Sequence, residues 1–371
     1  MLKIIYATSV IVGTIIGVGF FAIPFLTLKV GLWVMLGYFF VLGIVAILIH
    51  YFLGEVVLQS PDFVRIPGFA KIYLGKWGYR IALISGILGL LGACLAYLIL
   101  GGEFLAAILI PIFGGSVEMY TWLYFTLGAI LIFVGIKAID KVQFWGIVLF
   151  LLVLVGLFFR GRDHIDVSNF LVFDIDRSYI FLPYGVVLFS LWGLSLVPET
   201  EELLGKQRLL LRKIIPIAII IPIIVYIFFT FIILGITGEA TTESALTGLQ
   251  GIFDSGTTAM ILFLGVITTF TSFIALGLTL KKIFWFDLKI QKNLSWFIAC
   301  FIPIFLFTIG FKDFIRVVGF VGAVMLAVDG ILVTLMYQKI KPPKVRFITY
   351  PLIVGLILGI VYELIYTANI I

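Results

Sequence analysis

Nine stretches of the chain, each at least eighteen residues long, contain no Asp, Glu, Lys or Arg. They are residues 4–28, 30–54, 81–102, 119–136, 142–159, 178–198, 214–238, 255–280 and 293–311. A helix of about 20 apolar residues crosses a bilayer and satisfies its own backbone hydrogen bonds there. Residues 314–338 and 347–367 add two stretches that only Arg316, Asp329 or Glu363 interrupts. The sequence therefore predicts an all-α integral membrane protein with eleven transmembrane helices, which we number spans 1–11.

The composition excludes a soluble globular protein. Hydrophobic residues make up 63% of the chain and charged residues 12%, whereas soluble domains have about 45–50% and 25%. Cys94 and Cys300 lie inside apolar runs, and His50 and His164 are far apart in sequence. These residues form no metal-binding, disulfide or catalytic motif. We therefore expect neither an enzyme nor a bound cofactor.

The basic residues are divided unequally between the two sides of the predicted membrane. Nineteen of the 25 Lys and Arg residues fall on the side of the N-terminus. The six on the other side are Lys29, Arg160, Arg162, Arg177, Lys312 and Arg316. Because Lys and Arg are retained in the cytoplasm, the sequence predicts a cell-membrane protein with its N-terminus cytoplasmic and its C-terminus outside. The net charge of +6 thus reflects orientation, and we expect no nucleic-acid partner.

Spans 1 and 6 each contain a glycine that is followed, after four residues, by a proline. The pairs are Gly19 with Pro24 and Gly193 with Pro198. Glycine relaxes the backbone, and proline cannot donate to the carbonyl four positions earlier. Both helices are therefore predicted to break near the middle of the membrane. Such a break is tolerated where it lines a cavity or is buried in protein.

The position of the two breaks predicts a repeat and a ligand. They lie five spans apart, and since five is odd, the second unit has inverted topology, as in many secondary transporters. We expect repeats at 1–159 and 178–340 and an extra helix at 347–371, all in one membrane domain. A broken helix offers a positive end to a carboxylate and free carbonyls to an ammonium group. An α-amino acid carries both charges.

Helix packing is the alternative role for some of these glycines. Gly13 and Gly17 in span 1, and Gly355 and Gly359 in span 11, follow the small-xxx-small pattern that lets membrane helices approach closely. For span 11 we adopt the packing interpretation. For span 1 the matched Gly-x4-Pro motif in span 6 favours a binding site.

Four segments resemble the amino acid/polyamine/organocation transporter superfamily, which has the five-plus-five inverted-repeat LeuT-type fold. They are the glycine-rich run 13–24, the stretch Ala96 to Gly102 in span 3, Phe189 to Glu199 in span 6, and Thr271 to Phe273 in span 8. Within that superfamily the chain looks most similar to the amino acid/auxin permeases and the bacterial aromatic amino acid permeases. The similarity covers essentially the whole chain.

The resemblance implies a substrate site at the two breaks. It places the substrate carboxylate on the amides of Gly17, Val18 and Gly19, the amine on the carbonyls of Ile15, Phe189 and Ser190, and the side chain against Tyr97 and Trp192. An ordinary packing role for the Trp192 ring is the alternative.

Three hydroxyl groups share one face of span 8. Thr268, Thr271 and Ser272 have i, i+3, i+4 spacing, and such groups in membrane helices commonly bond their own backbone. The resemblance instead implies a sodium site. Its ligands would be the hydroxyls of Thr271 and Ser272 and the carbonyls of Thr268, Gly13 and Ile16, an all-oxygen shell that suits a hard cation.

Proton coupling is the alternative to sodium. Asp329 in span 10 is the deepest acidic residue, and its other interpretation is a hydrogen-bonded acid that stabilises packing. Phe20 stands where some relatives carry an Asn ligand for a second sodium, so we expect one sodium site. For Glu103, and for His50 and Glu55 near the cytoplasmic interface, we expect structural roles.

The sequence thus predicts a secondary active transporter that works by ion-coupled symport and alternating access, with sodium favoured over the proton. Because no charged residue is placed to match a charged side chain, we expect a neutral amino acid, hydrophobic or aromatic, as the small-molecule partner. The alternative is an amino acid sensor or receptor subunit of the same fold that binds without net transport.

Overall fold

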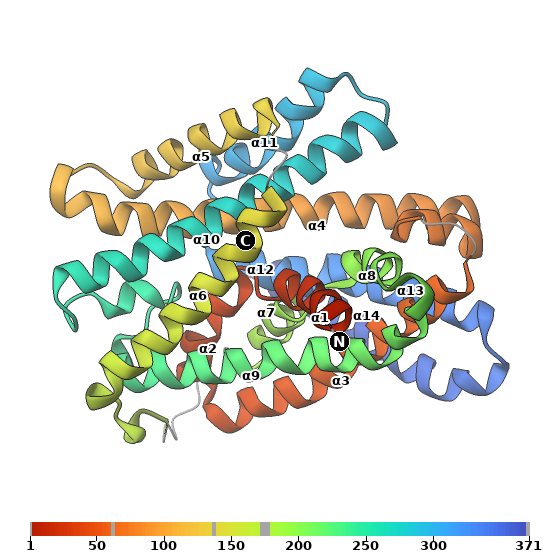
Figure 1. Ribbon diagram of the computed structural model, residues 1–371, viewed down its shortest axis with the longest axis horizontal. Helices are drawn as coiled ribbons and strands as arrows, with labels where there is room; N and C mark the ends of the chain where they lie inside the picture. The colour runs from red at the N-terminus through yellow and green to blue at the C-terminus, as the bar shows by residue number, and fades with distance from the viewer. Residues whose placement is uncertain (1, 61–63, 136–138, 171–178, 369–371) are drawn as a thin grey trace.

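A computed structural model describes residues 2–60, 64–135, 139–170 and 179–368, which form fourteen α-helices and several short turns of other helix types (Figure 1). The α-helices are α1 (Leu2–Ile15), α2 (Ile23–Val30), α3 (Leu32–Gln59), α4 (Ile66–Phe113), α5 (Val117–Val134), α6 (Ile139–Gly161), α7 (Leu182–Ser190), α8 (Val197–Leu204), α9 (Leu211–Thr237), α10 (Ser255–Lys282), α11 (Lys292–Thr308), α12 (Phe314–Phe320), α13 (Ala327–Ile340) and α14 (Arg346–Ala368). The described residues contain no β-strand.

The helices account for the eleven expected spans. In the described chain, seven helical stretches are long and apolar enough to cross a membrane, or eight with the bent pair α1 and α2. One of the seven, Leu182–Ala240, contains both span 6 and span 7. Span 5 corresponds to α6, and span 9 to the shorter apolar helix α11. The prediction of an all-α membrane protein is confirmed.

Both predicted breaks are present. α1 ends at Ile15, residues 16–18 are not helical, and the chain continues through a 3-10 turn at Gly19–Ala22 into α2, bent by 55°. α7 ends at Ser190, and α8 begins only at Val197 after a 3-10 turn at Leu194–Leu196. Each motif proline lies in the first turn of the helix that follows its break. Proline is favoured there because its missing N–H would have no partner in the helix.

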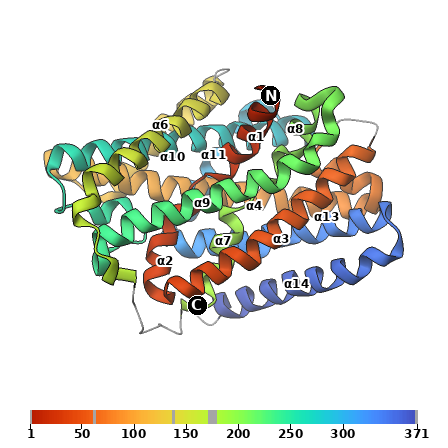
Figure 2. The same ribbon diagram turned by 60° about the horizontal axis from the view of Figure 1, so that its bottom comes forward.

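The helices around the breaks pack side by side. Figures 1 and 2 both show α1 next to α8, and Figure 2 shows α3, α9 and α13 running alongside one another with α14 at the edge of the molecule. α9 contacts α1, α2 and α3, so it lies against both halves of span 1. Tyr226 in the middle of α9 is fully buried there.

Span 10 contains a π-helical turn, Val321–Leu326, between α12 and α13. At this turn the backbone of span 10 touches the backbone of α7. A Cβ atom on Gly185 would collide with the carbonyl of Gly319, and one on Gly322 would collide with the carbonyl of Gly185. Glycine thus permits a backbone contact between α7 and span 10.

Span 11 packs through one of its two motif glycines. A Cβ atom on Gly359 would overlap the phenol of Tyr184 from α7, whereas a Cβ on Gly355 would meet nothing within 4 Å. The packing role predicted for the pair is therefore confirmed for Gly359 and wrong for Gly355, which faces an open groove.

Ion pairs gather at the two ends of the bundle. At the end predicted to be cytoplasmic, the buried carboxylate of Glu55 pairs with Arg212 and with Lys341. At the other end, Asp254 caps α10 and pairs with Arg160. Hydrogen bonds from Thr257 and from Arg160 lower the pKa of Asp254 to about 2. Which end faces the cytoplasm remains a prediction.

Candidate functional site

The two helix breaks touch each other at two points. A Cβ atom on Gly19 would lie 2.5 Å from Oγ of Ser190 and 2.7 Å from Cδ1 of Phe189. A Cβ atom on Gly193 would lie 2.7 Å from Cγ1 of Ile15. Real Cβ atoms do not approach other atoms so closely, so only glycine fits at these positions. The structure therefore brings together residues that are about 170 positions apart and that the sequence assigned to one site.

The hydroxyl of Tyr226 joins the carbonyl ends of the two broken helices. It lies 2.7 Å from the carbonyl oxygen of Ile15, at the end of α1, and 2.8 Å from that of Ser190, at the end of α7. A phenol has one proton to donate, so it can fully satisfy one of these carbonyls at a time. The carbonyl of Ile15 also accepts from the amide of Gly17, at 2.8 Å, and both carbonyls lie at the negative ends of helices.

Sequence analysis missed Tyr226. The available signal was that Tyr226 is the only tyrosine in the charge-free stretch 214–238 and lies near its middle. A buried tyrosine hydroxyl in a membrane needs a partner. The sequence alone could not show that two helix ends would supply it.

Tyr97 on α4 lies against the break in span 1. Its hydroxyl lies 2.7 Å from the position of a Cβ on Gly17. The same hydroxyl interacts with the side chain of Ser272 and with the backbone of Val18. Residues expected at the substrate site and one residue expected at the sodium site are thus in direct contact.

The side chain of Trp192 faces the surrounding helices. Its ring packs edge-to-face with the ring of His50, with 5.9 Å between centroids, and lies beside Gly330 of α13. The Trp192 amide donates to the carbonyl of Phe189 at 3.2 Å, so all three carbonyls expected to hold the amine already have a partner within the protein. These contacts favour the packing role for Trp192 that the sequence left as an alternative.

A buried aromatic cluster lies directly beside the break in span 1. Phe20 stacks on Tyr226 at 5.4 Å between centroids and on Phe21 at 4.2 Å. Phe229 meets Phe20 edge-on, and Phe104 meets Phe21 in the same way. Phe20, which stands where some relatives carry an Asn ligand for a second sodium, is therefore part of an apolar wall.

The three residues of span 8 expected at the sodium site differ in the present partners of their hydroxyl groups. Thr268 donates to the carbonyl of Leu264 at 2.9 Å, and Thr271 donates to the carbonyl of Thr268 at 3.1 Å, both within α10. Only Ser272 leaves its own helix to reach Tyr97. Gly13 lies in the last turn of α1. The sodium site remains a prediction.

The remaining ligand expected for sodium is Ile16, which lies just past the end of α1. Its amide donates to the carbonyl of Val12 at 2.9 Å. Ile16 belongs to the non-helical segment 16–18, and the role of its carbonyl in binding sodium stays a prediction.

The acidic and histidine residues inside the spans have specific partners. Asp329 is buried and accepts a hydrogen bond from Ser85 of α4. His50 and Glu55, expected near the membrane interface, are 0% and 1% exposed. Their depth in the membrane stays a prediction; within the protein, Glu55 binds two cationic side chains at one end of the bundle, and His50 binds the break in span 6. Glu103 interacts with Ser244 in the loop before α10.

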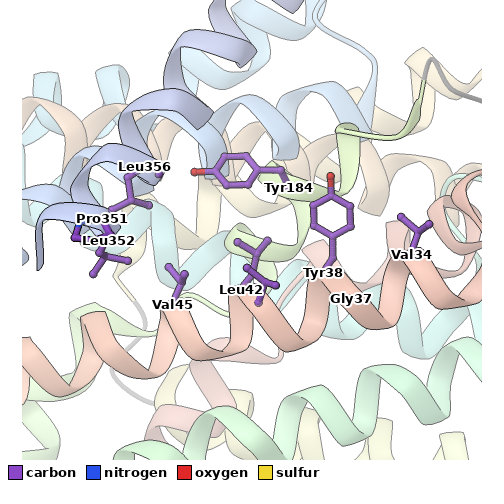
Figure 3. A pocket seen from close by; sticks show the side chains of 11 residues that line it. Val34, Gly37, Tyr38, Leu42, Val45, Tyr184, Pro351, Leu352 and Leu356 are labelled. Atoms are coloured by element: carbon purple, nitrogen blue, oxygen red, sulfur yellow. The ribbon is translucent and has the colours of Figure 1, made fainter. Parts of the chain in front are cut away.

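An apolar groove lies apart from the breaks, between α3 and α14 (Figure 3). Its lining includes Tyr38, Val45, Leu352 and Leu356, and the ring of Tyr184 lies over it (Figure 3). None of the residues expected to bind substrate or sodium lines this groove. Because it opens on the outer surface between two helices, we assign it to the lipid-facing surface and not to the site.

Solved structures of transporters share this architecture. The chain matches a closed, bromovinylhydantoin-bound structure of Mhp1, a nucleobase-cation-symport-1 family transporter, with a TM-score of 0.68, 11% identity and coverage of 98% of this chain and 91% of that one. It matches MhsT in complex with L-phenylalanine with a TM-score of 0.64, 14% identity and coverage of 97% and 98%. For inward-facing Mhp1 the values are 0.70, 14%, 92% and 76%. These likenesses confirm the LeuT-type fold.

The sequence comparisons identify a family. No curated protein matches the chain in sequence. The family model of the tryptophan/tyrosine permeases matches residues 1–370, almost the entire chain. Permeases move solutes across membranes, so the expectation of a multi-pass membrane transporter that is not an enzyme is confirmed. The chain belongs to the tryptophan/tyrosine permease family.

Proposed function

We propose that this protein is a secondary active transporter that carries neutral aromatic amino acids across the cell membrane by ion-coupled symport. The observation that carries the proposal is the meeting of two helix breaks around one hydroxyl group. Tyr226 brings the carbonyls of Ile15 and Ser190 to a common point, where an ammonium group with three N–H donors would satisfy both.

The substrate carboxylate would bind on the other side of the break in span 1, at the backbone amides that follow α1. The 3-10 turn that leads into α2 begins at Gly19, so the backbone amides of Val18 and Gly19 lie at its positive end. The amide of Gly17 donates to the carbonyl of Ile15 and would exchange this bond for one to the carboxylate. The lack of a Cβ at Gly17 and Gly19 lets a carboxylate approach that backbone. An amino acid would thus be held at both charges by backbone groups, as expected for the α-amino and α-carboxyl groups common to all amino acids.

The aromatic surroundings support a preference for aromatic side chains. Phe20, Phe21 and Phe229 form a wall beside Tyr226, and aromatic rings prefer edge-to-face or offset contacts with one another. The family name refers to tryptophan and tyrosine, and the neighbour MhsT is solved with L-phenylalanine. A transporter for tryptophan, tyrosine or phenylalanine fits these observations.

For the coupling ion we propose sodium ahead of the proton. The chain of contacts from Ser272 through Tyr97 to Val18 connects span 8 with the break in span 1. A cation near Thr271 and Ser272 would therefore affect the backbone that holds the substrate carboxylate. The alternative is proton coupling through Asp329, whose hydrogen bond to Ser85 joins α13 to α4.

The proposed transport cycle uses the two repeats, 1–159 and 178–340, with span 11 outside them. Spans 1 and 6 would move against the remaining helices around the central site, opening it to one side at a time. We propose an N-terminus in the cytoplasm and a C-terminus outside, from the excess of basic residues, and kinship within the superfamily to the amino acid/auxin and bacterial aromatic amino acid permeases.

Uptake into proteoliposomes tests this proposal. The purified protein is reconstituted, and labelled tryptophan, tyrosine, phenylalanine and lysine are offered with a sodium gradient and a pH gradient imposed separately. We expect accumulation of the aromatic amino acids with the sodium gradient and none of lysine. Accumulation driven only by the pH gradient would replace sodium with the proton. Binding without accumulation would instead support the sensor that the sequence left as an alternative.

A further inference from the structure

His50 makes a direct hydrogen bond to the break in span 6. It lies on α3 and is fully buried. Its Nε2 atom is 3.0 Å from the backbone nitrogen of Gly193, and its Nδ1 atom is 2.7 Å from the carbonyl oxygen of Ala46, one turn earlier in α3. Gly193 stands between the end of α7 and the 3-10 turn that precedes α8. The imidazole therefore joins a continuous helix to the non-helical part of a broken one.

The two partners assign the tautomer of the ring. A carbonyl oxygen only accepts, so Nδ1 must carry the proton and donate to Ala46. A backbone N–H only donates, so Nε2 must offer its lone pair to Gly193. One neutral tautomer thus satisfies both contacts. In the protonated ring both nitrogens are donors, and an N–H at Nε2 would oppose the N–H of Gly193. The bond to the break therefore exists only while His50 is neutral.

Several titratable groups lie on the helices packed against α3. They are Lys29 on α2, Tyr184 on α7, Glu199, Glu201 and Glu202 on α8, Arg212, Lys213 and Tyr226 on α9, and Asp329, Tyr337 and Lys339 on α13. Within the described residues none of these groups is bonded to the imidazole, whose partners are Ala46, Gly193 and the Trp192 ring.

The acidic side chains of α3 and α13 are already paired elsewhere. Glu55, also on α3, binds Arg212 and Lys341, and Asp329 accepts from Ser85. An imidazolium in this conformation would therefore be a buried charge with no described counter-ion, which is costly in a membrane. Proton binding is then favoured in a conformation in which the break has moved away from α3.

We propose that His50 is a proton-binding site that controls the break in span 6. A proton from water binds the lone pair of Nε2, the hydrogen bond from Gly193 is lost, and the segment around Gly193 is released from α3. When the proton leaves to water, the bond reforms. The inference rests on the proposed transport function but not on the identity of the coupling ion.

The chain supplies a matched control. It contains two histidines, and His164 is exposed in a short turn, Arg162–His164, after α6. Uptake of labelled tryptophan is measured with the same pH on both sides of the membrane, between about pH 4 and pH 8, a range that covers both an ordinary histidine and one whose protonation is opposed by burial. The variants are His50→Gln, whose amide oxygen can accept from Gly193 without titrating, and His164→Gln.

For the wild-type protein and His164→Gln, we expect uptake to rise several-fold as the pH falls. For His50→Gln we expect uptake that no longer changes with pH. A pH response that survives in His50→Gln, or a wild-type protein that shows none, would overturn the proposal.

A second measurement does not depend on transport. NMR of the protein with isotope-labelled histidine gives one set of ring signals per histidine, and His164→Gln identifies those of His50. We expect the Nδ1–H tautomer for neutral His50 and a reversible change at Nε2 on acidification. The Nε2–H tautomer would refute the proposed control of the break by His50. If no amino acid is taken up by any variant, the proposed function fails, while this measurement still decides the role of His50.

Discussion

Gly19 and Ser190 approach so closely that a Cβ on the glycine would lie 2.5 Å from the serine Oγ. The contact joins the break in span 1 to the end of α7, and it leaves the backbone of Gly19 uncovered by any side chain of its own. The shape of the site therefore requires glycine at position 19, and it depends on residues from both halves of the chain.

Gly19→Ala is expected to abolish amino acid uptake while the protein remains inserted in the membrane. The added methyl group would force Ser190 and Phe189 away from the break, and overpacking of this kind costs about 1–3 kcal/mol. The measurement is uptake into proteoliposomes at equal amounts of protein. Gly86→Ala is the control, because a Cβ there meets nothing within 4 Å, and it should transport normally. Normal uptake by Gly19→Ala would show that the substrate does not bind at Gly19.

Tyr226→Phe is expected to raise the KM for the substrate by about tenfold or more. The variant keeps the ring that stacks on Phe20 but loses the hydroxyl that holds the carbonyls of Ile15 and Ser190 together. Leaving buried polar groups without a partner costs about 1–3 kcal/mol, and 1.4 kcal/mol is a factor of ten in affinity.

The matched control for Tyr226→Phe is Tyr184→Phe. The hydroxyl of Tyr184 is buried and has no hydrogen-bond partner among the described residues, so its removal should leave the KM unchanged. Equal kinetics for the two variants would show that the bridge between the broken helices does not contribute to binding.

Replacing both Thr271 and Ser272 with Ala is expected to remove the dependence of uptake on sodium. The hydroxyl of Thr271 now bonds within α10 and would have to turn its oxygen toward the cation. The measurement is the initial rate of uptake at increasing sodium concentration. Thr279→Ala, which removes a hydroxyl bonded to Ala275 of the same helix, should retain sodium dependence. If uptake by the wild-type protein is driven by protons and does not depend on sodium, the alternative of proton coupling through Asp329 is favoured.

Glu55→Gln is expected to lower the melting temperature of the purified protein. The carboxylate of Glu55 is 1% exposed, whereas Arg212 and Lys341 are 48% and 26% exposed. Because water can solvate the two cations in part, we expect a loss of about 1–2 kcal/mol. Lys339→Ala, at an exposed site nearby, should have little effect. A melting temperature equal to that of the wild-type protein would mean that the ion pairs of Glu55 with Arg212 and Lys341 do not stabilise the fold.

The parts of the structure that follow local chemistry could be predicted from the sequence. Long charge-free stretches fold as helices in a bilayer because no other open-ended element satisfies its backbone. The breaks at Gly19 and Gly193 follow from glycine and proline at a fixed spacing. Both features depend on residues that are close in the chain, so the pattern is visible without the fold.

The contacts of single polar residues could not be predicted in this way. Tyr226 bonds Ile15 across 211 positions, and His50 bonds Gly193 across 143. Neither residue belongs to a repeated pattern, and its partner is a backbone atom, which leaves no trace in the sequence. The direction of the Trp192 ring was left open for a related reason, since a non-helical segment does not fix the face on which a side chain lies.

The backbone contact between α7 and span 10 has a consequence for motion in span 6. Gly185 and Gly322 hold the two helices too close to slide past each other without a steric clash, whereas α8 lies beyond the break and packs against α1. The two halves of span 6 therefore have different partners and different freedom. We expect that, when span 6 moves in the proposed cycle, α7 keeps its contact with span 10 while α8 rotates about residues 191–193.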